Sequence, residues 1–399
     1  MITKLFMMLA FALAFFNLNA QPKVFVLNAN RLQEIKNKAK QNDKETLGLV
    51  DRLKKQADEL LGMKLLSVMD KEFTPASGNK HDYMSLAPYF WYDSTKPNGI
   101  PYMRKDGQRN PEIYKITDHK YLADLDDATH VLSFTYYLTG EEKYADKAAA
   151  LLKHWFFDTA FSMNPNLDYA QAIPGKNNGR GIGLIETRSL MGIADAAGLL
   201  ENSQAWVNAD TKRLKRWYAA FLHWMLTSKN GNDEHRAKNN HGSWYLAQAT
   251  DYALFTGNKS VALSLSKEGK NKIDSQVTAE GKMPLELERT NALGYSTFNL
   301  NALFTLALLA QQSGVDLWHY INEKDAGLQA ALDWFIPYAL GEKEWQYKQI
   351  SKYNKSDLYP LLRVAAVEFK QPSYLMKANE IKEENSSVIN QLLYDNSKN

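Results

Sequence analysis

Apolar residues recur every three or four positions over most of the chain, which is the pattern of helices that bury one face. The pattern predicts helices at Tyr121–Leu138, Glu142–Trp155, Ile185–Leu200, Thr211–Leu226, Ser243–Phe255 and Thr297–Gln312. Alternation of apolar and polar positions, which would indicate half-buried strands, is scarce after the first hundred residues. We therefore expect an all-α protein.

Glycines stand near the ends of the predicted helices at nearly equal intervals. Gly140, Gly198, Gly257 and Gly314 follow one another in steps of 58, 59 and 57 residues. A glycine just past a helix can take the left-handed conformation that ends it, and such a step holds two average helices and a long connection. The alternative is that four of the 21 glycines fall in step by chance. A true repeat predicts helical hairpins arranged in a ring, an α/α toroid, with a cleft formed by the loops at one end.

The N-terminus is typical of an export signal. Lys4 precedes an apolar run from Leu5 to Phe16, and Leu18-Asn19-Ala20 offers a cleavage point before Gln21. The run is too short to span a bilayer, and no later stretch looks apolar enough to do so. The alternative is a buried N-terminal helix. We expect a signal peptide over residues 1–20, a periplasmic or secreted protein, and a single domain over residues 21–399, since no linker divides the chain.

Composition excludes several classes of site and partner. The chain has no cysteine, so disulfides, thiolate metal sites and a cysteine nucleophile are excluded. A net charge of +3 is too small to indicate nucleic acid, although basic groups gathered in a cleft could still attract a polyanion. None of the eight histidines forms a His-x-x-x-His pair. We expect a monomer with no metal, no cofactor and no membrane anchor.

A long segment from Ser85 to Pro111, rich in proline and aromatic residues, interrupts the helical pattern. A loop this long inside a compact domain is usually functional or disordered, and its aromatic content argues against disorder. The segment is either a lid over a cleft or a wrap that closes the ring, and both could hold. Its candidate substrate-binding residues are Tyr89, Trp91, Arg104 and Arg109.

A second irregular segment, from Asn164 to Gly181, is dense in amide, hydroxyl and glycine positions. Polar side chains of this kind bind sugar hydroxyls, and Asn166, Tyr169 and Gln171 are the candidates for substrate contact. The alternative is a turn-rich connector between two helices.

Two short stretches carry the groups for a reaction. Asn239–Tyr245 reads Asn-Asn-His-Gly-Ser-Trp-Tyr, and Glu288–Tyr295 lies about fifty residues later. Together they supply an amide, an imidazole, a guanidinium and a phenol, which can bind a carboxylate and move a proton beside it. This set suits removal of the proton α to the carboxyl group of a sugar acid, followed by loss of the glycosidic oxygen.

Each of these residues also has an ordinary structural explanation. One of the two asparagines could simply cap the following helix, and a lone histidine beside apolar residues is more often part of the core. Glu286 or Glu288 could form an ion pair with Arg289. The coherence of the four groups favours a catalytic site.

The motifs as a set resemble the alginate lyase superfamily of polysaccharide lyases. The resemblance rests on Asn-His followed by aromatic residues, and on Pro284–Arg289 (Pro-Leu-Glu-Leu-Glu-Arg) followed by a tyrosine. Ser85–Trp91 and Asn166–Gln171 are similar to the bacterial branch that degrades polymannuronate or glucuronan. The resemblance extends from about Ser85 to about Gln312. It implies an incomplete α/α toroid and an anionic polysaccharide substrate.

The resemblance also implies roles for individual residues. It implies that Asn240, His241 and Arg289 neutralise the uronate carboxyl group and that Tyr295 transfers the proton. Arg188 and Trp244 complete the candidate substrate-binding residues. Gly242-Ser243-Trp244 stands where typical members have Ser-Tyr-Trp, and Tyr295 is one residue closer to the arginine than usual. These departures leave the choice of uronic acid open.

Elementary chemistry agrees with these implied roles. The α proton becomes removable when fixed donors offset the charge of the adjacent carboxylate. A nearby Arg289 is expected to lower the pKa of Tyr295 by roughly one to three units. The C5 proton and the C4 oxygen lie on one face in mannuronate and glucuronate, so Tyr295 could take the proton and return it. In guluronate they lie on opposite faces, and His241 would have to be the base. We predict the syn route.

Two alternatives from other functional classes stay open. A glycoside hydrolase on a similar helical ring needs two carboxyl groups that flank the bond, and the available acids are Asp124, Asp126, Asp127 and Glu186. A non-catalytic glycan-binding protein would keep the cleft and lack turnover.

Overall fold

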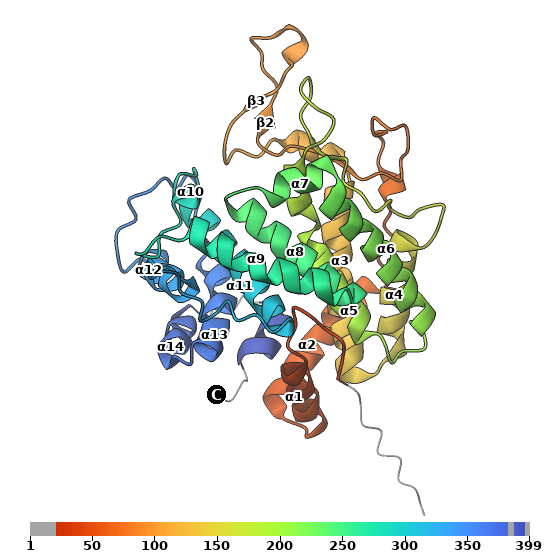
Figure 1. Ribbon diagram of the computed structural model, residues 1–399. Coiled ribbons are helices and arrows are strands. Elements are labelled where there is room, and N and C mark those ends of the chain that lie inside the picture. Colours follow the sequence, from red (N-terminus) through yellow and green to blue (C-terminus); the bar gives the residue numbers. More distant parts are fainter. Residues whose placement is uncertain (1–20, 382–386, 396–399) are drawn as a thin grey trace, which may run out of the picture.

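The computed structural model describes residues 21–381 and 387–395, and most of this part of the chain is helical (Figure 1). The predicted signal peptide, residues 1–20, lies outside the described residues. The helices are α1 (Ala29–Lys40), α2 (Lys44–Leu60), α3 (Asp118–Thr139), α4 (Glu142–Phe156), α5 (Leu190–Leu199), α6 (Asn208–Thr227), α7 (Lys229–His235), α8 (Asn240–Thr256), α9 (Lys259–Gln276), α10 (Pro284–Leu287), α11 (Ala292–Gln312), α12 (Leu328–Leu340), α13 (Tyr359–Glu368), α14 (Pro372–Glu380) and α15 (Val388–Asn390). The described strands are short: β1 (Met84–Leu86), β2 (Phe90–Trp91), β3 (Met103–Arg104) and β4 (Tyr169–Ala172).

The helices pack as hairpins around two central helices. Consecutive helices pair in α3–α4, α8–α9 and α13–α14, and α8 also packs on α6 and α11. Nearly every side chain of α8 is buried, which is the mark of an inner helix with neighbours on all sides. The all-α toroid predicted from the sequence is confirmed.

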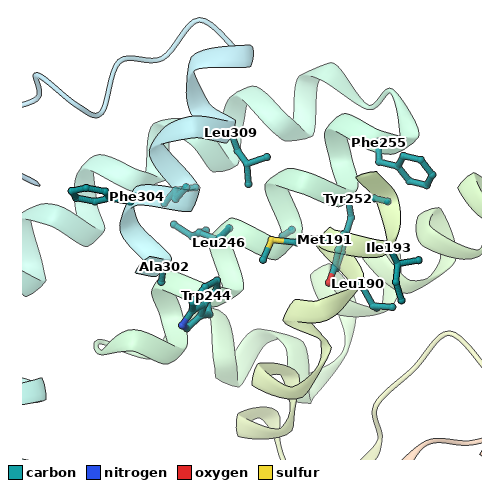
Figure 2. Close-up of a cluster of buried hydrophobic side chains, with 14 of the residues drawn as sticks. Leu190, Met191, Ile193, Trp244, Leu246, Tyr252, Phe255, Ala302, Phe304 and Leu309 are labelled. Atoms are coloured by element: carbon teal, nitrogen blue, oxygen red, sulfur yellow. The ribbon is translucent and has the colours of Figure 1, made fainter. Parts of the chain in front are cut away.

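One apolar core joins the inner helices. Leu190, Met191, Trp244, Leu246 and Phe304 belong to a single cluster of buried side chains from α5, α8 and α11 (Figure 2). Helix α11 is apolar and long enough to cross a membrane by composition alone, contrary to the expectation that no later stretch would be. Its most apolar window is 67% buried inside the fold, so its hydropathy reflects its place in this core.

The observed helices match the predicted ones best at their C-terminal ends. Helices α8 and α11 begin three and five residues earlier than predicted. Their first turns carry polar groups such as Asn240 and Tyr295, which the apolar periodicity does not include. The predicted helix over Ile185–Leu200 is divided: residues Gly181–Ser189 form a 3₁₀ helix, and α5 follows directly.

The four glycines of the repeat lie near the ends of helices, as predicted, but Gly198 does not end one. Gly140 and Gly257 end α3 and α8 with positive φ angles, and Gly314 lies just past α11. Gly198, by contrast, is a buried residue inside α5. A Cβ atom there would lie 2.0 Å from the carbonyl oxygen of Lys23. Because Gly198 has no side chain, the N-terminal segment can pack closely against α5. The glycine does not end the helix.

The two irregular segments lie side by side. Strand β1 pairs in parallel with β4, which joins the segment after Ser85 to the segment after Asn164. Strands β2 and β3 form an antiparallel hairpin that projects from the end of the molecule where α7 and α10 lie, opposite α1 and α2 (Figure 1). The irregular segments are thereby gathered at one end of the toroid.

Candidate active site

A cleft of about 790 Å³ opens at this end of the molecule. It is bounded by the first turns of α8 and α11 and by the 3₁₀ helix Gly181–Ser189. The residues at the base of the β2–β3 hairpin (88–90 and 104–109), called the stem below, form another side. Its lining side chains include Tyr89, Arg104, Arg109, His119, Gln171, Arg180, Glu186, Arg188, Asn240, His241, Arg289 and Tyr295. The long segment after Ser85 thus lines the cleft, as the lid hypothesis predicts.

Asn240 is the first residue of α8 and is held by a buried carboxylate. Its backbone N–H donates to Glu286 Oε1 and its side-chain Nδ2 donates to Oε2, both at 2.7 Å. Asn239 supplies the cap, since its side-chain oxygen accepts from the backbone N–H of His241. Asn239 therefore caps the helix, whereas the side chain of Asn240 is oriented in the cleft wall. The N-terminal end of the helix also makes this wall favourable for an anion.

His241 is oriented by a second carboxylate. Its Nδ1 lies 2.6 Å from Glu234 Oε1, and the Glu234 side chain is only 2% exposed. A carboxylate partner keeps the proton on Nδ1 and fixes the plane of the ring. Nε2 is then the nitrogen available to a ligand, as an acceptor in the neutral ring or as a donor in the charged one.

The guanidinium of Arg289 lies over the ring of Tyr295. The guanidinium carbon is 3.6 Å from the centre of the Tyr295 ring. The predicted ion pair with Glu286 or Glu288 is not the one that forms: Arg289 Nη2 donates to Asp106 Oδ1 at 2.8 Å. Glu286 is occupied by Asn240 instead. The sequence pointed to the acids next to Arg289, because the true partner, Asp106, lies 183 residues away in the chain.

The Tyr295 hydroxyl donates to the hydroxyl of Tyr89 at 2.9 Å. Burial is the main cause that raises the pKa of Tyr295, and the Tyr89 hydroxyl raises it further by accepting from the neutral phenol. Arg289 acts in the opposite direction but is outweighed, and Asp106 offsets part of its charge. Arg289 therefore lowers the pKa of Tyr295, as expected, but burial and Tyr89 outweigh it and the net shift is upward.

The predicted substrate-binding residues divide into two groups. Tyr89, Arg104, Arg109, Gln171 and Arg188 line the cleft together with the four groups of the proposed catalytic set. The structure places four others outside the lining: Trp91, Asn166, Tyr169 and Trp244.

Contacts elsewhere account for these four positions. The ring of Trp91 donates to Gln108 O at 2.9 Å, and the amide of Asn166 donates to Asp82 at 3.0 Å. Tyr169 begins β4. Trp244 is a buried core residue (Figure 2). Its ring packs on Phe298 with 5.2 Å between ring centres.

Arg180 and His119 line the cleft and were not predicted. Arg180 donates to the side chain of Gln171 at 2.8 Å and lies over the ring of Phe90. Its place between Gly179 and Gly181 in the polar segment was the available signal. Nothing in the sequence around His119, at the start of α3, indicated a place in the cleft. The lining described here holds five arginines and one glutamate, so the cleft attracts polyanions.

The acids considered for hydrolysis do not flank a common site. Asp124, Asp126 and Asp127 line a different cavity beside α2 and α3. Glu186 lies in the cleft, where its carboxylate accepts from Tyr83 and Ser85 at 2.7 Å each. In the part of the chain that the structure describes, no three His, Asp or Glu side chains are grouped to hold a metal ion.

Comparison with known proteins gives a consistent result. Residues 67–345 match the family model of alginate lyase. The chain is similar to an alginate lyase from Bacteroides ovatus, with 39% identity over 94% of this chain and 100% of that one, and a TM-score of 0.90.

More distant structures share the fold. Alginate lyase A1-III from Sphingomonas species A1 is 17% identical over 81% of this chain and 88% of that one, with a TM-score of 0.51. A variant of A1-III complexed with a tetrasaccharide is 16% identical over 87% and 95%, with a TM-score of 0.57. No curated protein sequence matches significantly.

Proposed function

Since the chain belongs to the alginate lyase family and is a polysaccharide lyase, we propose that it cleaves a polyuronate by β-elimination in the cleft described above. The observation that carries the proposal is the stacking of Arg289 on Tyr295 at 3.6 Å, in a wall that also holds Asn240 and His241. A guanidinium, an amide and an imidazole there can surround one carboxylate beside one phenol. This is the arrangement that α-proton removal requires.

The carboxylate is bound by groups whose orientation is already fixed. Glu286 holds Asn240 and Glu234 holds His241, so neither has to be ordered when the substrate arrives. Bound donors at the uronate carboxylate stabilise the negative charge that develops when the C5 proton leaves. Asn240, His241 and Arg289 are the groups that supply this stabilisation.

Tyr295 transfers the proton as a phenolate. Its oxygen takes the C5 proton, the C4–C5 double bond forms, and the C4–O bond breaks. The phenol then gives the same proton to the departing glycosidic oxygen, which regenerates the phenolate. This syn sequence suits polymannuronate and glucuronan, in which the C5 proton and the C4 oxygen lie on one face. His241 through Nε2 is the base on the opposite face for guluronate.

The cleft's charge supports a polymeric acid as the substrate. Arg104, Arg109, Arg180 and Arg188 lie in the same lining as the catalytic arginine and can meet carboxylates of neighbouring sugar units. The relative whose structure contains a tetrasaccharide supports the same assignment. A glycoside hydrolase would need a second carboxyl group opposite Glu186. Export to the periplasm or medium, a single domain over residues 21–399 and a monomeric state complete the proposal from the sequence.

Parallel digestion of polymannuronate, polyguluronate and glucuronan tests the proposal. We expect an increase in ultraviolet absorbance from the unsaturated product with polymannuronate or glucuronan, and a slower increase with polyguluronate. Sizing of the products by mass spectrometry would identify the unsaturated uronate at the new end. New reducing ends without the absorbance would indicate hydrolysis and contradict the proposal.

A further inference from the structure

Asp106, which the proposed mechanism does not use, accepts hydrogen bonds from three residues. Its Oδ1 accepts from Arg289 Nη2 at 2.8 Å and from Arg104 Nη2 at 2.7 Å. Its Oδ2 accepts from Arg289 Nε at 3.2 Å and from Thr290 through both the hydroxyl and the backbone N–H. Burial acts to raise the pKa of Asp106, but Arg289 and Thr290 together outweigh it and lower the pKa to about 2. The carboxylate is therefore ionised wherever the enzyme works.

The contact occupies only one edge of the guanidinium. An arginine presents five N–H donors in a plane, and a carboxylate can bind the Nε–Nη2 edge or the Nη1–Nη2 edge. Asp106 takes the Nε–Nη2 edge. The Nη1–Nη2 edge is left for a second carboxylate, so Asp106 and a substrate acid can bind Arg289 together.

The backbone next to Asp106 is shaped for this contact. Gly107 has a φ of 73°, and a Cβ atom there would lie 2.4 Å from Thr290 Oγ1 and 3.1 Å from Asn291 Nδ2. The turn can approach residues 290–291 this closely only because glycine has no side chain. The stem of the β2–β3 hairpin is thus docked on the segment that carries Arg289.

We infer that Asp106 is a positioning residue for the elimination: it holds the Nε–Nη2 edge of Arg289, keeps the guanidinium over the ring of Tyr295 and directs the other edge to the substrate carboxylate. The inference rests on the proposed function. It makes the catalytic arginine depend on a segment outside the helical ring. Removal of Asp106 leaves Arg289 charged but free to rotate about its side-chain bonds.

The test is steady-state kinetics of Asp106→Asn on the best polymer. An amide places an N–H group against the donors of Arg289, so we expect kcat to fall 10- to 100-fold while KM changes less than about threefold. Asp106→Glu restores the carboxylate and should recover at least a third of the lost activity on a logarithmic scale. Asp93→Asn is the matched control in the same segment: it removes the same charge, its carboxylate accepts from Thr95, and its kinetics should equal wild type.

Other outcomes overturn the inference. Wild-type kinetics for Asp106→Asn would show that Arg289 needs no positioning, and a rise in KM alone would indicate only docking of the hairpin. A higher kcat with a lower KM would mean that Asp106 competes with the substrate. Should Asp106→Asn fail to fold, Thr290→Val replaces it: a severalfold loss of kcat supports the inference and an unchanged kcat contradicts it. Activity retained in Tyr295→Phe would instead contradict the proposed function.

Discussion

Each group proposed to bind the substrate carboxylate has a carboxylate partner of its own. Glu286 holds Asn240, Glu234 holds His241 and Asp106 holds Arg289. Such partners fix the directions of the donors before the substrate binds, which lowers the cost of ordering them. The same surroundings bury Tyr295 and favour its neutral form.

The raised pKa of Tyr295 predicts an alkaline pH dependence. Because the phenolate is the base, kcat/KM should increase with pH through the alkaline range and should not be level near pH 7. Tyr89→Phe removes the hydroxyl that accepts from the neutral phenol, so the ascending limb should move to lower pH. The measurement is kcat/KM from pH 6 to 11, with circular dichroism as a control for folding. A limb that stays in place in Tyr89→Phe would contradict this account of the tyrosine pair.

The four groups of the proposed catalytic set could be named from the sequence, whereas their partners could not. Asn240, His241, Arg289 and Tyr295 stand in two recognisable stretches. Asp106 is one of many acids in the chain, and only the folded structure brings it to Arg289. The direction of the net pKa shift of Tyr295 could not be predicted from the sequence either, because the burial that causes it depends on every element around the ring.

Among the elements, the β2–β3 hairpin and its stem matter most for the site. The stem carries Tyr89 to Tyr295 on α11, and it carries Asp106 to Arg289 in the turn that precedes α11. The sequence revealed the segment as a break in the helical pattern, together with its aromatic residues. It could not reveal which part projects and which part lines the cleft, since that depends on the pairing of β1 with β4.

Gly107→Ala tests the docking of the stem. The new Cβ atom would overlap Thr290 Oγ1, so the turn should withdraw and kcat/KM should fall about tenfold or more. Gly78→Ala is the matched control, because Gly78 has a similar φ of 78° but no heavy atom within 4 Å of the added Cβ. Both variants should lose about 1 kcal/mol of stability from the backbone strain. Equal kcat/KM in the two variants would contradict a functional role for the docked turn.

At the scale of the whole molecule, a buried ion pair ties an irregular segment to the helical ring. Lys71 Nζ lies 2.9 Å from Asp118 Oδ2, and both side chains are fully buried. Lys71 also donates to the backbone oxygens of Val68 and Lys80 at 2.7 Å. Burial raises the pKa of Asp118 to about 6 even with the lysine present. Nothing in the local sequence marks these two residues as partners, because the pair forms between segments 47 residues apart.

Lys71→Met should lower the free energy of unfolding by about 3–5 kcal/mol at pH 8, because Asp118 loses its partner and stays buried. The loss should shrink at pH 5, since the carboxyl group takes up a proton as the pH falls below its raised folded pKa. Lys64→Met is the control: its pair with Asp70 is largely exposed, and its loss should cost less than about 1 kcal/mol. Denaturant unfolding at both pH values gives the comparison, and equal losses for the two variants would contradict it.

The most direct test of the central claim compares Tyr295→Phe and His241→Ala on polymannuronate by the absorbance of the unsaturated product. The account predicts that Tyr295→Phe abolishes product formation, because the variant lacks the hydroxyl that transfers the proton. His241→Ala should retain measurable turnover with a higher KM, since His241 only helps to bind the carboxylate of this polymer. Near wild-type turnover in Tyr295→Phe, together with complete loss in His241→Ala, would contradict the assignment.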